Sequence, residues 1–237
     1  MIAVTPSAMY DALGAVFSAL IVVACLVGLT LHRDVYDNLP RRDFFCYYTN
    51  LSNLLVLIYF MFAAPLLFRY PAMHKIIPLI EYSVVMSIML TNIVFHGMIL
   101  PAVRPLMPDI VPDRCARLLA ANNLFVHYIV PWLTFSYWLF CSPEKSRLTL
   151  AGSLLWMAFP LLYIGCMFLR AKRHPCIAGT RSRYPYPFLN VDALGVRHVT
   201  STCLKISAAC AAVSILVFAM IHMLYALLGG GWPIVLI

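Results

Sequence analysis

Three polar residues lie close together in an otherwise apolar stretch, FFCYYTNLSNLLVLIYFMF (residues 44–62). Thr49, Ser52 and Asn53 follow the spacing i, i+3, i+4, which places all three on one face of a helix. Asn50 points to another side. An unsatisfied polar group is costly in hydrocarbon, so this face is expected to be turned toward the interior of a helix bundle.

Two later apolar segments each carry an asparagine one helical turn before a histidine. The first pair is Asn92 and His96, and the second is Asn123 and His127. Pro131 follows His127 by four residues, so the backbone N–H that would bond to the His127 carbonyl is missing. The sequence therefore predicts a kink and a free carbonyl beside His127.

A threonine and a histidine on neighbouring helices can split an ester. The imidazole of His127 can take the proton of Thr49 as its hydroxyl attacks an acyl carbon. Carboxamide donors from Asn53 or Asn123 can stabilise the resulting oxyanion. We therefore predict Thr49 and His127 as a catalytic pair. The predicted supporting polar residues are Asn53, Ser52, Asn123, Asn92 and His96.

The same residues also have a purely structural interpretation. Ser, Thr and Asn commonly bridge transmembrane helices, with about 0.6–2 kcal/mol from each such bond, and a buried Thr can bond back to the i−4 carbonyl. His222 stands alone in the last apolar segment and is expected to form a helix–helix contact. Glu81 lies at the end of an apolar segment and is expected to be solvated.

The composition indicates the setting in which these residues work. The chain has 237 residues, of which 63% are hydrophobic and only 11% charged, against about 25% charged residues in ordinary soluble domains. Uncharged apolar runs of about 18 residues or more are typical of membrane-spanning helices. We predict an all-α polytopic membrane protein with one domain, residues 1–237, and six transmembrane helices. The predicted spans are 12–31, 44–68, 82–103, 118–140, 148–169 and 206–228.

The distribution of Lys and Arg predicts the orientation. The segments after the first, third and fifth spans contain 3, 3 and 7 of these residues, whereas the opposite segments contain 2 and 2 and the termini none. The positive-inside rule then places the basic segments in the cytoplasm and both termini on the outer side. The net charge of +8 is thus explained by topology, and no nucleic-acid partner is predicted. The 8 cysteines show no C-x-x-C spacing, so neither a disulfide framework nor a metal site is expected.

The last long connection contains the segment RYPYPFLNVDALG (183–195), in which three aromatic residues are interleaved with two prolines. That composition is unlike a disordered linker. Two placements remain open from sequence alone. The segment either lies in the lipid headgroup layer or folds over a cavity on the cytoplasmic side.

Three strings, YYTNLSNLLV, LFVHYIVPW and YPYPFLNVDALG, resemble bacterial six-helix membrane proteins related to the androgen-induced and androgen-dependent TFPI-regulating proteins of animals. The resemblance implies a hydrolase of fatty acid esters of hydroxy fatty acids, with a threonine nucleophile matching Thr49 and a histidine matching His127. It also implies the bacterial inner (cytoplasmic) membrane. The Asn-Leu-Ser-Asn after Thr49 is characteristic of the bacterial branch, not of the animal enzymes, so the substrate stays open.

The expected function is therefore an intramembrane lipid ester hydrolase without a cofactor, acting on a membrane lipid or fatty acyl ester that enters from the inner leaflet. Basic loop residues are expected to hold a fatty acid carboxylate, and the candidates are Arg41, Arg42, Arg114 or Arg117. The alternatives are a lipid or small-solute transporter or binding protein, and a haem-binding electron carrier that uses His96 and His127. The sequence leaves the oligomeric state open.

Overall fold

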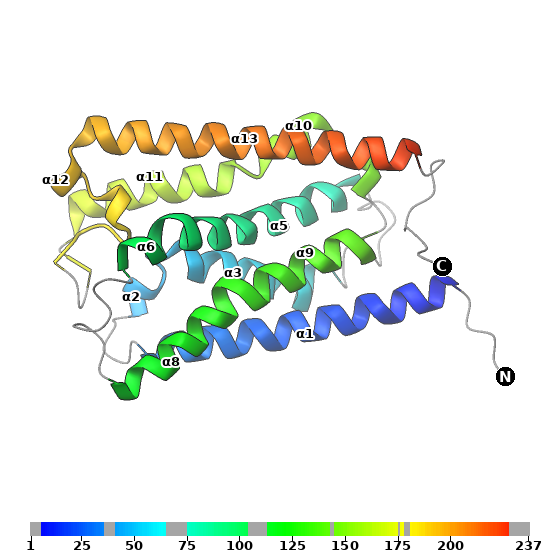
Figure 1. The fold of residues 1–237 in the computed structure, drawn as a ribbon, viewed down its shortest axis with the longest axis horizontal. Helices are drawn as coiled ribbons and strands as arrows, with labels where there is room; N and C mark the ends of the chain where they lie inside the picture. Colours follow the sequence, from blue (N-terminus) through cyan, green and yellow to red (C-terminus); the bar gives the residue numbers. More distant parts are fainter. Residues whose placement is uncertain are drawn as a thin grey trace.

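The computed structural model describes residues 6–35, 41–64, 75–103, 113–142, 145–174, 176–177 and 181–227. Within these residues every regular element is a helix. The helices form an elongated bundle, with most axes running along its length (Figure 1). The predicted all-α fold class is confirmed for the described part of the chain.

The helices follow one another along the chain in this order. The first half contains α1 (Pro6–Val35), α2 (Arg41–Phe44), α3 (Tyr48–Ile58) with the π-helical turn η1 (Tyr59–Ala63), and α5 (Ile77–Val94) with η3 (Phe95–Ile99) and α6 (Leu100–Val103). The second half contains α8 (Asp113–Leu124), η5 (Phe125–Ile129), α9 (Val130–Cys141), η6 (Lys145–Arg147), α10 (Leu150–Leu155), α11 (Ala158–Arg173), η7 (Pro187–Leu189), α12 (Val191–Leu194) and α13 (Val196–Leu227).

Among the described residues, five helices are long and apolar enough to cross a membrane, which indicates an integral membrane protein. They are Ala12–Leu31, Ile77–Ile99, Leu119–Cys141, Leu150–Arg173 and Val196–Leu227. The predicted second span corresponds to a shorter apolar helix, Tyr48–Ala63, and its last predicted residues, 65–68, lie outside the described part. The count of six spans and the orientation of the termini therefore stay predictions.

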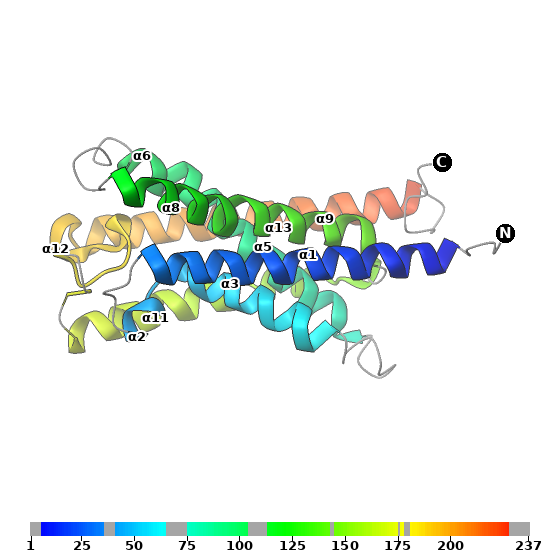
Figure 2. The same cartoon turned by 90° about the horizontal axis from the view of Figure 1, so that it is seen from below.

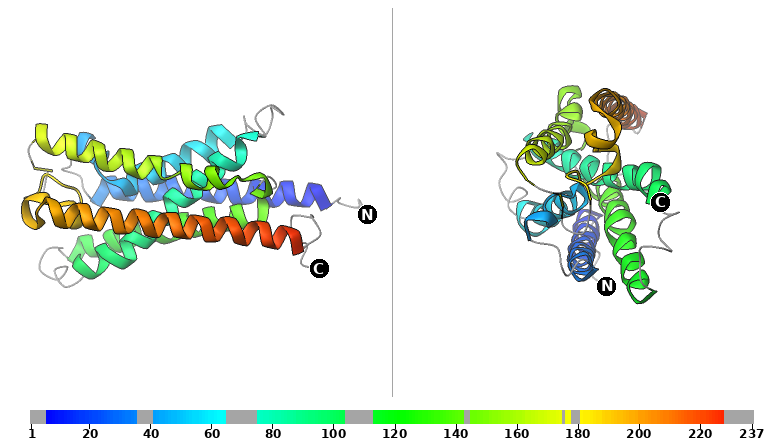
Figure 3. Two further views of the ribbon diagram at one scale, coloured as in Figure 1. Left: turned by 90° about the horizontal axis from the view of Figure 1, so that it is seen from above. Right: turned by 90° about the vertical axis from the view of Figure 1, so that its left-hand side faces the viewer.

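The bundle places residues from distant parts of the chain together. α1 packs against α3, α8 and α9, α5 packs against α3 and α9, and α10 packs against α13. α2 and α12 lie at one end of the bundle, whereas α1 begins and α13 ends at the other (Figures 1 and 2). The views in Figure 3 show α13 running along most of the length of the bundle beside α11.

α1 approaches η5 closely at Gly28. A Cβ added at Gly28 would lie 2.8 Å from Cγ1 of Val126 and 3.2 Å from Cβ of Phe125. At the same place the Asn122 side chain donates a hydrogen bond to the Gly28 carbonyl, with an N···O distance of 2.9 Å. Only a residue without a side chain fits here, because the neighbouring atoms belong to a packed helix.

Gly28→Ala is expected to lower the free energy of unfolding by about 1–3 kcal/mol, since the added methyl group forces α1 and η5 apart. Gly14→Ala is the matched control on the same helix. Its added Cβ would meet Cys141 and Tyr137 at 3.8 Å, an ordinary contact, and alanine has the better helix propensity. Thermal unfolding of both variants in one detergent checks this, and equal melting temperatures would contradict it.

The predicted irregularity beside His127 is present as the π-helical turn η5, immediately before Pro131. The carbonyl of His127 accepts a hydrogen bond from the Asn92 side chain of α5 at 2.6 Å. The carbonyl of Val126 accepts one from the Asn53 side chain of α3 at 3.2 Å. Carbonyls exposed by the proline and the π-turn are thus satisfied by asparagines of two neighbouring helices.

Glu81 is not solvated, so that expectation was wrong. Its side chain is 1% exposed at the end of the bundle opposite α2. Its carboxylate accepts a hydrogen bond from the Tyr59 hydroxyl at 2.9 Å and a short one from the Ser142 hydroxyl. A buried carboxylate needs such donors to offset its lost hydration. Here the donors come from η1 and from the end of α9, and the carboxylate comes from α5.

Lys145 caps the C-terminal end of α9, close to Glu81. Its Nζ donates to the carbonyls of Trp138, Leu139 and Ser142 at 3.0, 2.6 and 3.0 Å. These are carbonyls of the last turn, which lack partners within the helix. Burial lowers the pKa of Lys145 to about 7, and the nearby Glu81 carboxylate opposes that shift.

Candidate functional site

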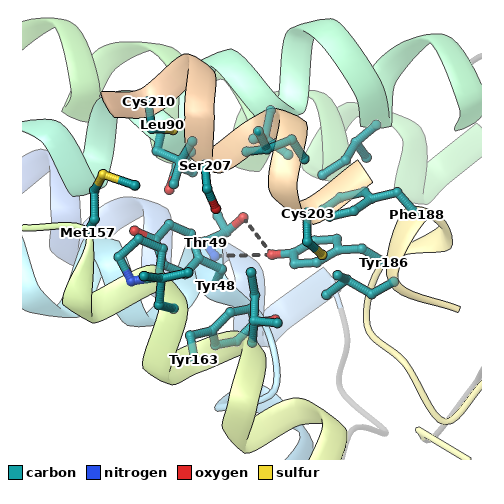
Figure 4. A pocket seen from close by; sticks show the side chains of 18 residues that line it. Tyr48, Thr49, Leu90, Met157, Tyr163, Tyr186, Phe188, Cys203, Ser207 and Cys210 are labelled. Carbon is teal, nitrogen blue, oxygen red and sulfur yellow. Dashed lines mark hydrogen bonds between the residues drawn. The ribbon is translucent and has the colours of Figure 1, made fainter. Parts of the chain in front are cut away.

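Thr49 lies in the wall of a cavity of about 70 Å³, near the end of the bundle that carries α2 and α12. α3, α5, α11, α13 and the connection before α12 enclose this Thr49 cavity (Figure 4). Its lining is mainly apolar. The lining residues that carry hydroxyl groups are Tyr48, Thr49, Thr91, Tyr163, Tyr186 and Ser207. A cavity of this kind suits a hydrocarbon chain with one polar group.

Tyr186 reaches Thr49 from a segment that sequence reasoning did not connect with it. The N–H of Thr49 donates to the Tyr186 hydroxyl at 3.3 Å, and the two hydroxyl oxygens are 3.5 Å apart. The Tyr186 ring stacks on Phe188 with a centroid distance of 5.5 Å. Burial raises the pKa of Tyr186, whereas the hydrogen bonds with Thr49 oppose that shift. The phenol is therefore neutral and able to donate.

The segment 183–195 folds over a cavity in the structure, whereas the side of the membrane that this cavity faces stays a prediction. Tyr184, Tyr186 and Leu189 are 9%, 7% and 1% exposed, because they pack onto the bundle. Tyr186, Phe188 and Leu189 line the Thr49 cavity. The segment that carries Tyr186, Phe188 and Leu189 thus forms a cover over the cavity. The alternation of aromatic residues and prolines in the sequence indicated an ordered segment, but it did not show which residue the cover would contact.

Two arginines fasten the cover to the bundle. Arg170 of α11 forms an ion pair with Asp43 of α2 at 3.0 Å, and these side chains are 14% and 2% exposed. Arg170 also donates to the Arg183 carbonyl at 3.2 Å. Arg183 in turn donates to the Ala171 carbonyl at 3.1 Å and pairs with Asp192 at 2.6 Å, where both side chains are more exposed.

Asp43→Ala is expected to loosen the cover strongly, because it leaves the buried guanidinium of Arg170 without its carboxylate, a change that typically costs about 3–5 kcal/mol. We expect trypsin to cleave after Arg181 at least about tenfold faster, given that 1.4 kcal/mol corresponds to a factor of ten. Asp192→Ala removes the exposed pair instead and should change the cleavage rate little. Equal rates for the two variants would contradict this assignment.

Ser52 and Asn53 share the interior face of α3 with Thr49, as the spacing predicted, and both are fully buried. The Ser52 hydroxyl lies 2.7 Å from the Thr91 hydroxyl of α5. The Asn53 amide nitrogen donates to the Thr49 carbonyl at 2.8 Å and to the Val126 carbonyl at 3.2 Å. These bonds join α3 to α5 and to η5, so both residues bridge helices in this structure.

His127 is buried on η5, with 6% of its surface exposed. Its ring stacks on Phe95, with centroids 3.7 Å apart and planes at 8°. It is not among the described residues that line the Thr49 cavity, whereas the hydroxyl group of Thr49 lies beside that of Tyr186. Asn53 connects the surroundings of the two predicted catalytic residues. Its amide nitrogen donates to the carbonyl of Thr49 and to the carbonyl of Val126, which precedes His127.

The other predicted polar residues lie in different surroundings. His96 is exposed, and its Nδ1 is 3.2 Å from the Tyr128 hydroxyl. Asn92 bonds the His127 carbonyl. Asn123 is half-buried near the end of α8. His222 meets the Leu148 carbonyl at 3.0 Å, just before α10, in keeping with the structural role expected for it.

Within the described part of the chain, no group of three or more His, Cys, Asp or Glu side chains could hold a metal ion. The four arginines expected to bind a carboxylate, Arg41, Arg42, Arg114 and Arg117, have side chains that lie outside the described part.

Comparisons with protein-family models, with curated proteins and with solved structures find no match to this chain.

Proposed function

We propose that this protein is an integral membrane hydrolase of lipid esters, with Thr49 as nucleophile and His127 as base. Its setting is the bacterial cytoplasmic membrane, with six spans and both termini on the outer side. The observation that carries this proposal is the position of the Thr49 side chain. Thr49 lines a mainly apolar cavity between apolar helices, and its hydroxyl lies beside the Tyr186 hydroxyl.

The lining fits an acyl ester better than a polar solute. Leu90, Val94 and Ile164 provide apolar walls for a chain, whereas a polar solute would lose its hydration there without enough compensating hydrogen bonds. The ester group would lie beside Thr49, where the neutral Tyr186 phenol can donate a hydrogen bond to the carbonyl oxygen. A donor aimed at a developing oxyanion is worth about 3–4 kcal/mol in acyl transfer.

The proposed reaction has two steps, which form and then hydrolyse an acyl-threonine. Oγ1 of Thr49 attacks the acyl carbon while its proton passes to His127, and the alcohol leaves with that proton. Water then hydrolyses the acyl-threonine, with His127 again as base. Catalytic hydrogen bonds are often long in the absence of substrate and tighten in the complex. Asn53 supports this pairing, because it keeps α3 and η5 in fixed register beside both residues.

A lipid-binding or transport function is the second candidate. The observation in its favour is that the described residues lining the Thr49 cavity include no Asp, Glu, Lys, Arg or His. A cavity that only binds an apolar ligand needs no base in its wall.

Labelling with a fluorophosphonate probe, combined with an assay for fatty acid release, separates the two candidates. The purified protein in lipid nanodiscs is expected to react with the probe and to hydrolyse a fatty acid ester of a hydroxy fatty acid. His127→Ala should prevent both. Saturable binding of the same lipid without labelling or hydrolysis would overturn the hydrolase and leave the binding function.

A further inference from the structure

A second cavity of about 210 Å³, three times the volume of the Thr49 cavity, lies between α5 with η3 and α13. Its walls include Met89, Ile93 and Gly97 on one side and Ala209 and Val213 on the other. We call it the α5–α13 cavity. Four residues, Leu90, Val94, Ile206 and Cys210, line both cavities. The two spaces are therefore neighbours separated by side chains that they share.

The α5–α13 cavity lies between two helices that are long and apolar enough to span a membrane. Ile93 and Val213, in its walls, are 55% and 41% exposed. Hydrocarbon is the surrounding medium at such a surface. Among the described wall residues, only Trp156 has a side chain with a strong hydrogen-bond donor, and it already donates to the Ser214 hydroxyl at 2.7 Å. An occupant therefore finds mainly apolar contacts.

The walls are also adaptable. Met86, Met89 and Met98 contribute unbranched, flexible side chains. A Cβ added at Gly97 would meet no atom within 4 Å, so there is open space beside the backbone of η3. The helix changes there from α to π geometry, and such turns occur frequently at functional sites. These features suit a chain of variable conformation better than a rigid ligand.

We propose, resting on the function proposed above, that the α5–α13 cavity binds one acyl chain of a bilayer lipid and is the lateral entrance to the Thr49 cavity. A chain lying between Ala209 and Gly97 would pass the four shared residues to place its ester beside Thr49. Entry from the side keeps the chain in an apolar medium throughout, which avoids the cost of exposing it to water.

A tryptophan at the entrance tests this proposal. Ala209→Trp fills the α5–α13 cavity, whereas Ala208→Trp is the matched control, because Ala208 is exposed on the same helix but lines neither cavity. The probe is a long-chain fatty acid with a mid-chain diazirine and a terminal alkyne, photolysed with the protein in nanodiscs. Adducts that excess oleate competes away should map to residues 86–98 and 206–213. Ala209→Trp should reduce these adducts about tenfold, and Ala208→Trp should leave them unchanged.

The outcomes for the entrance and for the hydrolase are distinguishable. Saturable adducts in the α5–α13 cavity, lost in Ala209→Trp, support the entrance even if no ester is hydrolysed. Hydrolysis that proceeds equally in wild type, Ala209→Trp and Ala208→Trp, with competable adducts mapped to other helices, overturns the entrance and leaves the hydrolase. Equal adduct yields from both tryptophan variants also overturn it.

Discussion

Thr49→Val is expected to abolish the release of fatty acid from a lipid ester, with a fall of about 10³-fold or more. The substitution replaces the hydroxyl by a methyl group of similar size, and loss of a nucleophile removes the covalent route altogether. The effect on folding should be small. The Thr49 N–H still donates to the Tyr186 hydroxyl, and the oxygen–oxygen contact that is lost is long, at 3.5 Å.

Two variants serve as controls for this result. Thr49→Ser keeps a hydroxyl at the same position and should retain measurable activity. Ser52→Ala removes a hydroxyl one turn away that bonds Thr91 and does not line the cavity. It should therefore keep activity within a few-fold of wild type. Single-turnover rates on one lipid ester check all three variants, and a Thr49→Val protein that keeps a tenth of the wild-type rate would refute the nucleophile assignment.

Glu81→Ala is expected to destabilise the protein strongly, with a loss of about 3–5 kcal/mol in the free energy of unfolding. It leaves the buried hydroxyls of Tyr59 and Ser142 without their acceptor. It also removes the carboxylate that opposes the lowered pKa of Lys145. The Tyr59, Glu81 and Ser142 contacts tie η1 and α5 to the end of α9, so their loss should open this end of the bundle.

Glu81→Gln is the matched control, because it keeps the size of the side chain and one acceptor oxygen. It should lose clearly less stability than Glu81→Ala. Thermal unfolding of the purified variants in one detergent at pH 7.5 measures the difference. Melting of Glu81→Ala within about one degree of wild type would show that the buried contacts contribute little.

The local features of this protein were predictable from sequence because they depend on residues close together in the chain. Apolar runs without charges give the membrane helices. The i, i+3, i+4 spacing predicts that Thr49, Ser52 and Asn53 share a buried face, and all three are buried. Pro131 lacks the N–H that a regular helix needs at that place, and the turn before it is irregular.

The partners of these residues were decided by tertiary structure alone. Thr49 meets Tyr186, 137 residues later, and Asn53 meets Val126, 73 residues later. Glu81 was expected in solvent and is buried, because η1 and the end of α9 bring hydroxyl groups to it. The spacing of polar residues in a sequence tells which face of a helix is polar. Every polar residue in hydrocarbon also needs a partner, and the packing of the helices decides which partner is within reach.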